Sequence, residues 1–200
     1  MLISKSFYHK ISDEQWKIIE PHLPKPKSTP GINPPTWIDW GVFEKILQSL
    51  VENSRKYLID SKFCKVHQPA AGARKIHALV NEHFQLVSVE LSGGNVHDSE
   101  MAIKVLSKIT LEGKKILADK GYCSEEIRNF ISQEKAEVCI PAKSNAVVIH
   151  TFVKELYKSR NIIERFFQRI KNYRHVATRY DKLSNCFLNF IILAAVMIQI

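Results

Sequence analysis

Three acidic residues stand at positions where their carboxylates could act together. Asp60 ends the apolar segment RKYLID, Asp119 ends KKILAD, and Glu164 interrupts the apolar helix pattern of YKSRNIIERFFQRIK. Taken singly, each has an ordinary interpretation, because an aspartate commonly begins a turn and a helical glutamate commonly pairs with an arginine four residues away. Taken together, the three residues suggest one shared site.

The chemistry of such a site follows from the charges. If the strands before Asp60 and Asp119 are parallel neighbours, their ends lie about 5 Å apart. Two carboxylates at that distance repel each other unless a proton or a divalent cation lies between them. With Glu164 as a third ligand, the set suits Mg²⁺ or Mn²⁺. Two such ions about 4 Å apart can activate the attacking oxygen and stabilise the leaving oxygen in phosphoryl transfer.

The helix pattern around Glu164 adds cations to this site. At about 100° per residue, Tyr157, Arg160, Glu164 and Lys171 fall within roughly a 60° arc. The buried face would carry Leu156, Ile163, Phe166, Phe167 and Ile170. Glu164 therefore lies on a polar stripe beside the core face, and Arg160 and Lys171 on the same stripe are placed to hold a phosphate.

The charge of the chain indicates the partner. The 200 residues carry a net charge of +9, which favours nucleic acid before membrane as the partner. Residues 154–182 contain nine basic and three acidic residues, a net charge of +6. A basic face kept only for solubility is the alternative interpretation. Besides Arg160 and Lys171, the candidate DNA contacts are Arg165, Arg169, Arg174, Arg179 and Lys120, of which Lys120 could instead only complete a turn.

The remaining composition indicates a cytoplasmic protein. The four cysteines are scattered without a C-x-x-C pair, which predicts neither a zinc site nor disulfides and fits a reducing compartment. The N-terminal MLISKSFYHK lacks the apolar core of a signal peptide. The apolar tail FLNFIILAAVMIQI has 14 residues, which is short for a membrane span, so we predict a buried core helix there.

The order of predicted elements places the acidic residues in an α/β fold. A short helix with a Ser12–Gln15 capping box ends at Pro21 and Pro24, and a Pro-rich linker follows at 24–35. We predict helices at 36–53, 97–109 and 124–135, followed by the basic helix and the apolar terminal helix. Strands are expected at 55–60, with extended chain to 67, at 75–80 and 85–91 as a hairpin, and at 114–119 and 136–141. This order predicts a mixed sheet with three early antiparallel strands, two later strands, and helices on both faces.

The same residues carry a resemblance to a known family. The spacing Tyr157-x2-Arg160-x3-Glu164-x6-Lys171 matches the Y-R-E-K signature of DDE-type insertion-sequence transposases, in the branch named for insertion sequences four and five. Segments at 11–24, 58–61, 67–74, 93–102, 117–122, 140–145 and 177–190 also resemble that family; they read ISDEQWKIIEPHLP, LIDS, HQPAAGAR, GGNVHDSEMA, LADKGY, IPAKSN and ATRYDKLSNCFLNF. The ordered set is far more specific than any one segment.

The resemblance implies a fold, an activity and partners. It implies an RNase H-like domain at residues 37–200, preceded at 1–36 by the remnant of an N-terminal domain. Asp60, Asp119 and Glu164 would be the catalytic triad that binds two Mg²⁺ or Mn²⁺ ions. Arg160 and Lys171 would contact phosphates, and Tyr157 would lie beside the DNA end. The partners implied are double-stranded DNA, as terminal repeats and as target, and further copies of the chain on that DNA.

Other candidate residues have weaker support. His97-Asp98 looks like a family motif, but Asp98 is also a good helix N-cap, and we expect the cap. His67 and His77 could be metal ligands, but no partner cysteines accompany them. Ordinary strand histidines are therefore expected at these two positions.

The chain also departs from the family pattern. A Pro-rich junction at 24–35 replaces part of a longer helical region, and Arg74 directly precedes Lys75 where relatives carry a Gly-rich basic stretch. The sequence resembles an internally shortened copy. A transposase is the main hypothesis, and a DNA-binding remnant without catalysis and an RNase H-like nuclease are the alternatives. The intact triad favours catalysis, and the Y-R-E-K stripe favours a transposase over a nuclease.

Overall fold

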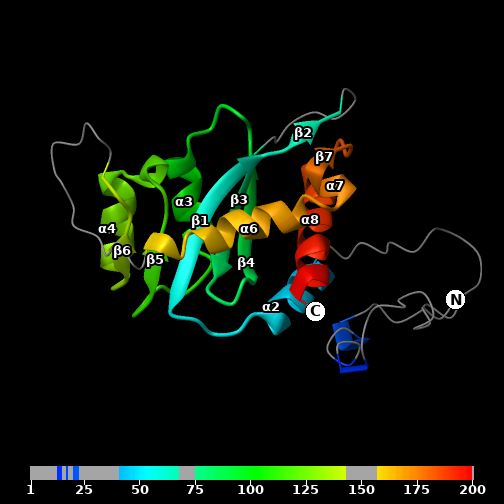
Figure 1. Cartoon of the computed structure of the whole chain (residues 1–200), viewed down its shortest axis with the longest axis horizontal. Coiled ribbons are helices and arrows are strands. Elements are labelled where there is room, and N and C mark those ends of the chain that lie inside the picture. The colour runs from blue at the N-terminus through cyan, green and yellow to red at the C-terminus, as the bar shows by residue number, and fades with distance from the viewer. Residues whose placement is uncertain are drawn as a thin grey trace, which may run out of the picture.

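The central feature of the molecule is a five-stranded mixed sheet (Figure 1). The computed structural model describes residues 13–14, 17, 20–22, 41–67, 75–142 and 157–199. The sheet has the order β4-β3-β1-β5-β6. Its strands are β1 (Lys56–Phe63), β3 (Lys75–Asn81), β4 (Leu86–Ser92), β5 (Lys115–Leu117) and β6 (Glu137–Cys139). Because β1, β3 and β4 pair antiparallel while β5 and β6 run parallel to β1, the predicted RNase H-like mixed sheet is confirmed.

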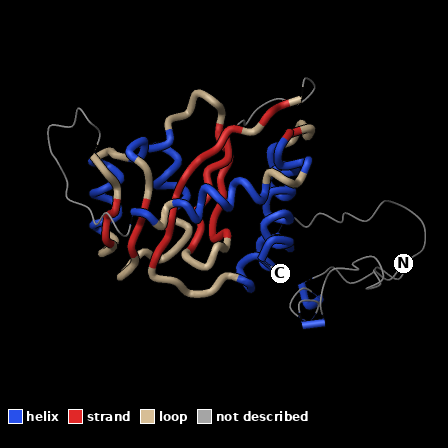
Figure 2. Tube along the Cα trace, in the orientation of Figure 1, coloured by secondary structure: helices blue, strands red, loops and turns tan. Residues whose placement is uncertain are grey.

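Helices cover both faces of this sheet, as the order of elements predicted. They are α2 (Gly41–Leu50), α3 (Asp98–Leu106), α4 (Glu125–Gln133), α6 (Asn161–Ile170), α7 (Arg174–Ala177) and α8 (Ser184–Gln199), with short 3₁₀ turns η2 (Glu20–His22) and η3 (Lys120–Tyr122). Helices α3 and α4 pack on one face, and α2, α6 and α8 pack on the other. Figure 2 shows α6 lying across the strands.

The alternation of side chains along β1 divides the core into two layers. Leu58 packs under α6 and α8 with Phe166 and Ile191, whereas its neighbour Ile59 packs under α3 with Val105. All five side chains are almost completely buried. Because successive residues of a strand point to opposite faces, Asp60 shares the α6 face with Leu58, and Ser61 shares the α3 face with Ile59.

The apolar tail forms α8, the buried core helix that its short length predicted. Its buried residues include Phe187, Ile191, Ala194 and Ala195. None of the helices in the described part of the chain is long and apolar enough to cross a membrane. None of the four cysteines, all of which lie in that part, is in a disulfide.

The observed elements differ from the predicted ones in several places. The helix predicted at 36–53 is described only as α2, and residues 51–53 are not helical. A two-stranded parallel sheet of β2 (Lys65–Val66) and β7 (Thr178–Arg179) was not predicted, because segments so short and so far apart carry no periodic signal. The Ser12–Gln15 capping box, the 24–35 linker and the Arg74 junction lie outside the described residues, so the division at residue 36 stays a prediction.

Candidate active site

The parallel pairing of β1 with β5 brings Asp60 and Asp119 to one edge of the sheet. Leu58 lies opposite Leu117 in this pair, and each aspartate follows its leucine by two residues. Two residues along a strand return to the same face, which here is the face that α6 covers. The condition stated from the sequence, that the two strands are parallel neighbours, is therefore met.

The prediction that Asp60 ends its strand is wrong. Strand β1 continues to Phe63, and Asp60 lies opposite Ala78 within the antiparallel ladder. The strand continues because β3 pairs with it as far as the Phe63–Lys75 register. Asp60 therefore sits on the ordered part of a central strand, which fixes its backbone more firmly than a turn would.

Asp119 both caps a turn and faces the site. It follows β5 and is the N-cap of η3, where its Oδ1 accepts a hydrogen bond of 2.6 Å from the amide of Gly121. Its Oδ2 points to Arg160, at 3.7 Å from Nη2. Asp119 therefore has both of the expected environments. Its Oδ1 stabilises the turn, and its Oδ2 faces the candidate site.

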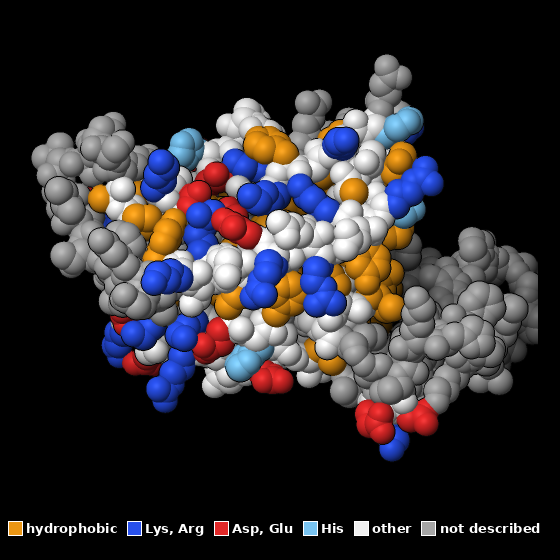
Figure 3. Space-filling model, in the orientation of Figure 1, with side chains coloured by type: hydrophobic (Ala, Val, Ile, Leu, Met, Phe, Trp, Pro, Cys, Tyr) orange, Lys and Arg blue, Asp and Glu red, His pale blue; other side chains and the backbone are white. Residues whose placement is uncertain are grey.

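One arginine lies among the three predicted carboxylates. Arg160 Nη2 lies 3.6 Å from Asp60 Oδ2, 3.7 Å from Asp119 Oδ2 and 3.3 Å from Glu164 Oε1. Figure 3 shows acidic side chains gathered on the α6 face of the molecule with Lys and Arg side chains around them. The structure therefore brings together the three acidic residues that the sequence singled out, with a single guanidinium in contact with each.

Asp60 is the most buried member of this group, with 5% of its surface exposed. Its Oδ1 accepts a hydrogen bond of 2.8 Å from the amide of Ser61, while its Oδ2 has no hydrogen-bond partner among the residues that the structure describes. Burial raises the pKa of the Asp60 carboxyl, and the Ser61 amide, Lys62 and Arg160 oppose that rise. Asp60 thus needs a nearby cation to carry its charge.

The chain winds more tightly just before α6. The amide of Arg160 donates to the carbonyl of Tyr157 and that of Ile162 to Ser159, both at 3.0 Å, so these bonds span three residues instead of four. Helix α6 accordingly begins at Asn161, and the expected continuous helix from Tyr157 to Lys171 is wrong. The tighter turn sets Arg160 at the N-terminus of α6, within reach of both aspartates.

Tyr157 and Arg160 are in contact across that turn. Arg160 Nη1 lies 3.4 Å from the Tyr157 hydroxyl, and the guanidinium lies 6.0 Å from the centre of the tyrosine ring. Burial alone would lower the pKa of Arg160, but the Tyr157 hydroxyl, Asp60 and Asp119 outweigh it and raise the pKa. The guanidinium is therefore firmly charged.

Lys171 lies at the other end of α6 and contacts the sheet. It is the C-cap of the helix, and its Nζ donates a hydrogen bond of 2.9 Å to the carbonyl of Phe63 at the end of β1. Seven residues separate it from Glu164, about 10 Å along a helix axis. Its ammonium group is therefore beside the candidate site and not within the carboxylate group.

The donor set fits a hard cation in its chemistry. Asp60, Asp119 and Glu164 supply only oxygen atoms, and one of them is the buried Oδ2 of Asp60, which forms no hydrogen bond within the described ranges. Within the described ranges no three Asp, Glu, His or Cys side chains are close enough to hold a metal ion as they stand. Arg160 lies in the space between the carboxylates, so a cation would have to take its place.

Arg179 does not belong to the DNA-binding surface that the sequence suggested. Its side chain is completely buried, its Nε and Nη2 donate to the carbonyls of Asp181 and Lys182 at 2.9 Å each, and it packs 5.4 Å from the centre of the Phe187 ring. The expected DNA contact at Arg179 is therefore wrong, because this guanidinium holds the loop before α8 together.

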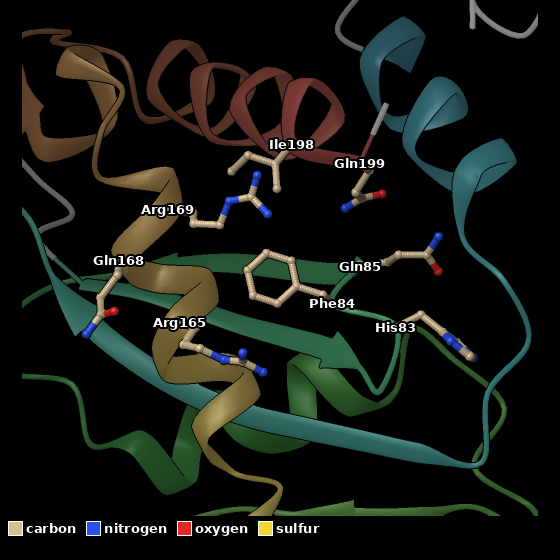
Figure 4. A pocket seen from close by; sticks show the side chains of 8 residues that line it. All are labelled: His83, Phe84, Gln85, Arg165, Gln168, Arg169, Ile198 and Gln199. Atoms are coloured by element: carbon tan, nitrogen blue, oxygen red, sulfur yellow. The ribbon is translucent and has the colours of Figure 1, made fainter. Parts of the chain in front are cut away.

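The other basic candidates are accessible. Lys120, Arg165, Arg169 and Arg174 are all exposed. Arg165 and Arg169 line a cavity of about 570 Å³ between α6, the β3–β4 turn and the end of α8; the other lining residues are His83, Phe84, Gln85, Gln168, Ile198 and Gln199. Figure 4 shows the Phe84 ring between the two arginines, and Arg169 lies 5.3 Å from the ring centre. None of the described lining residues is acidic, so this cavity suits an anion.

Asp98 does not cap α3, contrary to the expectation from the sequence. His97 is the N-cap and Asp98 is the first helical residue. The Asp98 carboxylate accepts a hydrogen bond from Ser61 Oγ at 2.8 Å and forms an ion pair with Lys75 Nζ at 2.6 Å. Ser61 and Lys75 were not singled out from the sequence as partners of Asp98. Two signals were present in the sequence: Ser61 directly follows Asp60, and Asp98 lies in the family-like segment GGNVHDSEMA.

The two histidines considered as metal ligands are structural. His77 lies completely buried on β3, and its Nε2 is 2.7 Å from Ser92 Oγ. Burial lowers the pKa of His77 to about 4. His67 follows β2, where its ring lies 5.3 Å from the ring of Tyr180. The interpretation of both as ordinary histidines of the strand region agrees with these contacts.

Comparison with known proteins identifies the family. A sequence model described as the transposase DDE domain matches residues 53–198. The chain belongs to the transposase DDE domain family. The match spans all three acidic residues of the candidate site and begins three residues before β1. The predictions of a DDE transposase and of its enzyme class are confirmed at this level.

A curated relative supports membership of the transposase DDE domain family. It is a Brucella ovis protein described as a candidate transposase for insertion sequence element IS6501. The two chains are 32% identical over 125 residues, which is 62% of this chain and 95% of the relative.

Several solved structures resemble this member of the transposase DDE domain family. The simian T-cell lymphotropic virus intasome in complex with PP2A regulatory subunit B56 gamma matches with TM-score 0.46 and 17% identity, over 71% of this chain and 48% of that one. The catalytic core domain of BIV integrase matches with TM-score 0.46 and 10% identity, over 71% and 83%. The catalytic domain of Mos1 mariner transposase matches with TM-score 0.35 and 10% identity, over 96% of each. The chain thus spans about half the length of the intasome chain.

Proposed function

We propose that this transposase nicks DNA at the ends of an insertion sequence and transfers the 3′ ends to target DNA in a metal-dependent reaction. The observation that carries the proposal is the contact of one guanidinium with Asp60, Asp119 and Glu164, which come from three separate elements. Carboxylates gathered in this way repel one another unless a cation or a proton lies between them, which supports a cation-binding site here.

The three carboxylates would hold two Mg²⁺ or Mn²⁺ ions. Such ions, when bound, activate the attacking oxygen and stabilise the leaving oxygen of the phosphodiester. Asp60 is held by its strand and by the Ser61 amide, and Asp119 by its bond to the Gly121 amide. Glu164 is the most accessible of the three, with 46% of its side chain exposed, and can adjust to the incoming ions.

Arg160 would then act on the DNA. If the three carboxylates held metal ions, the Arg160 guanidinium would be free to leave its three contacts and pair with a phosphate beside the scissile bond. Tyr157, which contacts the same guanidinium, would lie next to the DNA end. Lys171 would hold a neighbouring phosphate from the C-terminal end of α6.

The exposed cations Arg165, Arg169, Arg174 and Lys120 would bind the DNA backbone outside the site. Backbone contacts of this kind position the duplex and make its binding sensitive to salt. We assign the chain to the branch of insertion sequences four and five on the Y-R-E-K spacing. In that assignment it acts in the cytoplasm on the DNA of the nucleoid, as an oligomer that holds terminal repeats and target together.

The deciding experiment incubates the purified protein with the DNA that flanks its own gene, with and without Mn²⁺. We expect nicks at the element ends only with Mn²⁺, and no nicks with Asp119→Ala, which should still bind the DNA. Cleavage by Asp119→Ala at the wild-type rate would refute the assignment of the triad. Binding without nicking by the wild type would favour the DNA-binding remnant, and nicking without preference for the ends would favour a nuclease.

A further inference from the structure

A polar cluster lies behind Asp60, on the face of the sheet opposite α6. Ser61 points to this face, and its Oγ donates a hydrogen bond of 2.8 Å to Oδ1 of Asp98. The same oxygen lies 2.6 Å from Lys75 Nζ and 3.7 Å from His77 Nδ1. Asp98 begins α3, Ser61 lies on β1, and Lys75 and His77 lie on β3. One carboxylate oxygen thus joins the helix to two strands.

The cluster is largely shielded from water. The exposed fractions of the side chains are 24% for Asp98, 12% for Lys75 and 0% for His77. The buried Tyr122, which belongs to the turn that follows Asp119, is close enough for Asp98 to add to the effect of burial in raising the pKa of its hydroxyl. Hydrogen bonds and ion pairs at such a place hold the groups in one arrangement, because water cannot readily replace them.

Ser61 connects this cluster to the catalytic site. Its side chain is held by Asp98 on one face of the sheet, and its amide donates to Oδ1 of Asp60 on the other. Asp98 lies 37 positions from Ser61 along the chain, so the contact is part of the tertiary structure and not a local turn. A change at Asp98 would reach the Asp60 carboxylate through two successive hydrogen bonds.

We propose that Asp98 is a positioning residue, which sets the orientation of the Asp60 carboxylate by fixing Ser61 from the far face of the sheet. The proposal rests on the proposed function, because it concerns Asp60 as a ligand of the divalent ions. As a positioning residue, Asp98 would act through Ser61 and would contact neither those ions nor the DNA. Partners that orient metal ligands from behind commonly change metal affinity 10- to 100-fold when they are lost.

The test compares four variants of the full chain. Asp98→Ala removes both bonds of the carboxylate, and Asp98→Asn keeps an oxygen that can accept from Ser61 Oγ. Ser61→Ala removes the link but leaves the Asp98–Lys75 ion pair. Glu90→Gln is the matched control, since Glu90 on β4 pairs with Lys104 and Lys108 at 3.2 and 2.7 Å across the same α3–sheet interface.

Two readouts separate positioning from stability. Amide exchange at Ser61 and its neighbours, measured without metal, should rise about tenfold in Asp98→Ala. The Mn²⁺ dissociation constant should also rise about tenfold. Ser61→Ala should weaken Mn²⁺ binding similarly, Asp98→Asn should recover much of the loss, and Glu90→Gln should lower only the melting temperature.

Two outcomes would overturn the proposal. One is an Asp98→Ala protein that is destabilised like Glu90→Gln but keeps the wild-type exchange at Ser61. The other is increased exchange together with an unchanged Mn²⁺ affinity. If the wild type itself binds no Mn²⁺, the proposed function fails. The amide-exchange comparison still decides whether Asp98 holds β1 in place at Ser61.

Discussion

The guanidinium of Arg160 lies 3.6 Å from Oδ2 of Asp60, a buried oxygen that forms no hydrogen bond within the described ranges and whose other ion-pair partner is Lys62 Nζ at 3.8 Å. The same guanidinium contacts Asp119 and Glu164. Arg160 therefore offsets the mutual repulsion of the carboxylates in the protein without metal. Under the proposed function, a divalent ion and this side chain would compete for the same three partners, which leads to the first prediction.

Arg160→Met should destabilise the metal-free protein and tighten its binding of Mn²⁺. Removing one partner of a fully buried ion pair costs about 3 kcal/mol, because the remaining charge loses its counterion. The loss here should be about 1 kcal/mol, since the side chains of Arg160, Asp119 and Glu164 are 21%, 34% and 46% exposed and water screens their charges. The free energy of unfolding in urea and the Mn²⁺ dissociation constant measure the two effects. Arg165→Met, an exposed change on the same helix, should leave both quantities unchanged. An Arg160→Met protein as stable as the wild type would show that the guanidinium does not stabilise the site.

Gly121→Ala should impair cleavage while leaving the fold intact. A Cβ at this position would come within 2.8 Å of Oδ1 of Asp119, so the carboxylate must turn aside. Misplacement of a reacting group by about 1 Å can cost 100-fold in rate. Single-turnover cleavage rates and melting temperatures measure the effect and its selectivity.

Gly113→Ala is the control for Gly121→Ala, because it should lower stability without affecting cleavage. Gly113 has φ +71°, and no described atom lies within 4 Å of the position that a Cβ would take there. An alanine at this residue is strained, so stability should fall by about 1 kcal/mol while cleavage by the folded protein stays at the wild-type rate. Equal cleavage rates for the two variants would mean that the Asp119 orientation is not set by its turn.

Arg165→Ala combined with Arg169→Ala should reduce the salt dependence of DNA binding. Both residues are exposed on α6, and each phosphate contact that is lost lowers the slope of log K against log salt by about one unit. Binding titrations at several salt concentrations measure the slope. Lys104→Ala with Lys135→Ala removes the same charge from exposed positions on α3 and after α4, and should leave the slope unchanged. Equal slopes for both double variants would exclude the α6 face as the DNA surface.

His77 should make the fold sensitive to acid. Its pKa is about 4 in the folded protein against 6.5 for the ordinary side chain, so the unfolded chain binds the proton more tightly. Its contribution to stability is complete above about pH 6.5 and is lost as the pH falls toward 4, by about 3 kcal/mol in total. Urea unfolding at pH 7 and pH 4 should therefore show a smaller loss for His77→Asn than for the wild type. Identical losses would mean that His77 is not held neutral by burial.

The family resemblance indicates that the junctions at 24–35 and at Arg74 are shortened, and we expect this shortening to limit the joining step of the proposed function more than the nicking step. The triad lies on β1, after β5 and on α6, which the junctions at 24–35 and at Arg74 do not remove. Nicking needs one phosphate and water, whereas joining needs two ends held in one complex. A strand-transfer assay with end-containing duplexes and a plasmid target should show weak nicking and little paired insertion. Efficient paired insertion would show that nothing essential is missing.

Much of the fold, and the grouping of the three acidic residues of the candidate site, could be predicted from local patterns. Short apolar runs at 57–59 and 116–118 predicted the strand that carries Asp60 and the strand that precedes Asp119. The parallel pairing of these strands agrees with the α/β order of the later elements. The Y-R-E-K spacing pointed to Arg160 and Glu164, which do share one site. These features depend on residues a few positions apart, and such spacing is visible in one sequence.

The tertiary structure alone decided which charged side chains are exposed, which are buried, and which of them contact one another. Arg165 and Arg179 look alike in a basic segment, yet one is exposed and the other is completely buried against Phe187. The 3₁₀-like turn at Tyr157–Arg160 brought Arg160 to the aspartates, and chain reversal through β3 and β4 brought Asp98 to Ser61. Burial and contact across 37 residues arise only when the sheet and helices pack, because they depend on the sum of many distant neighbours and not on any local pattern.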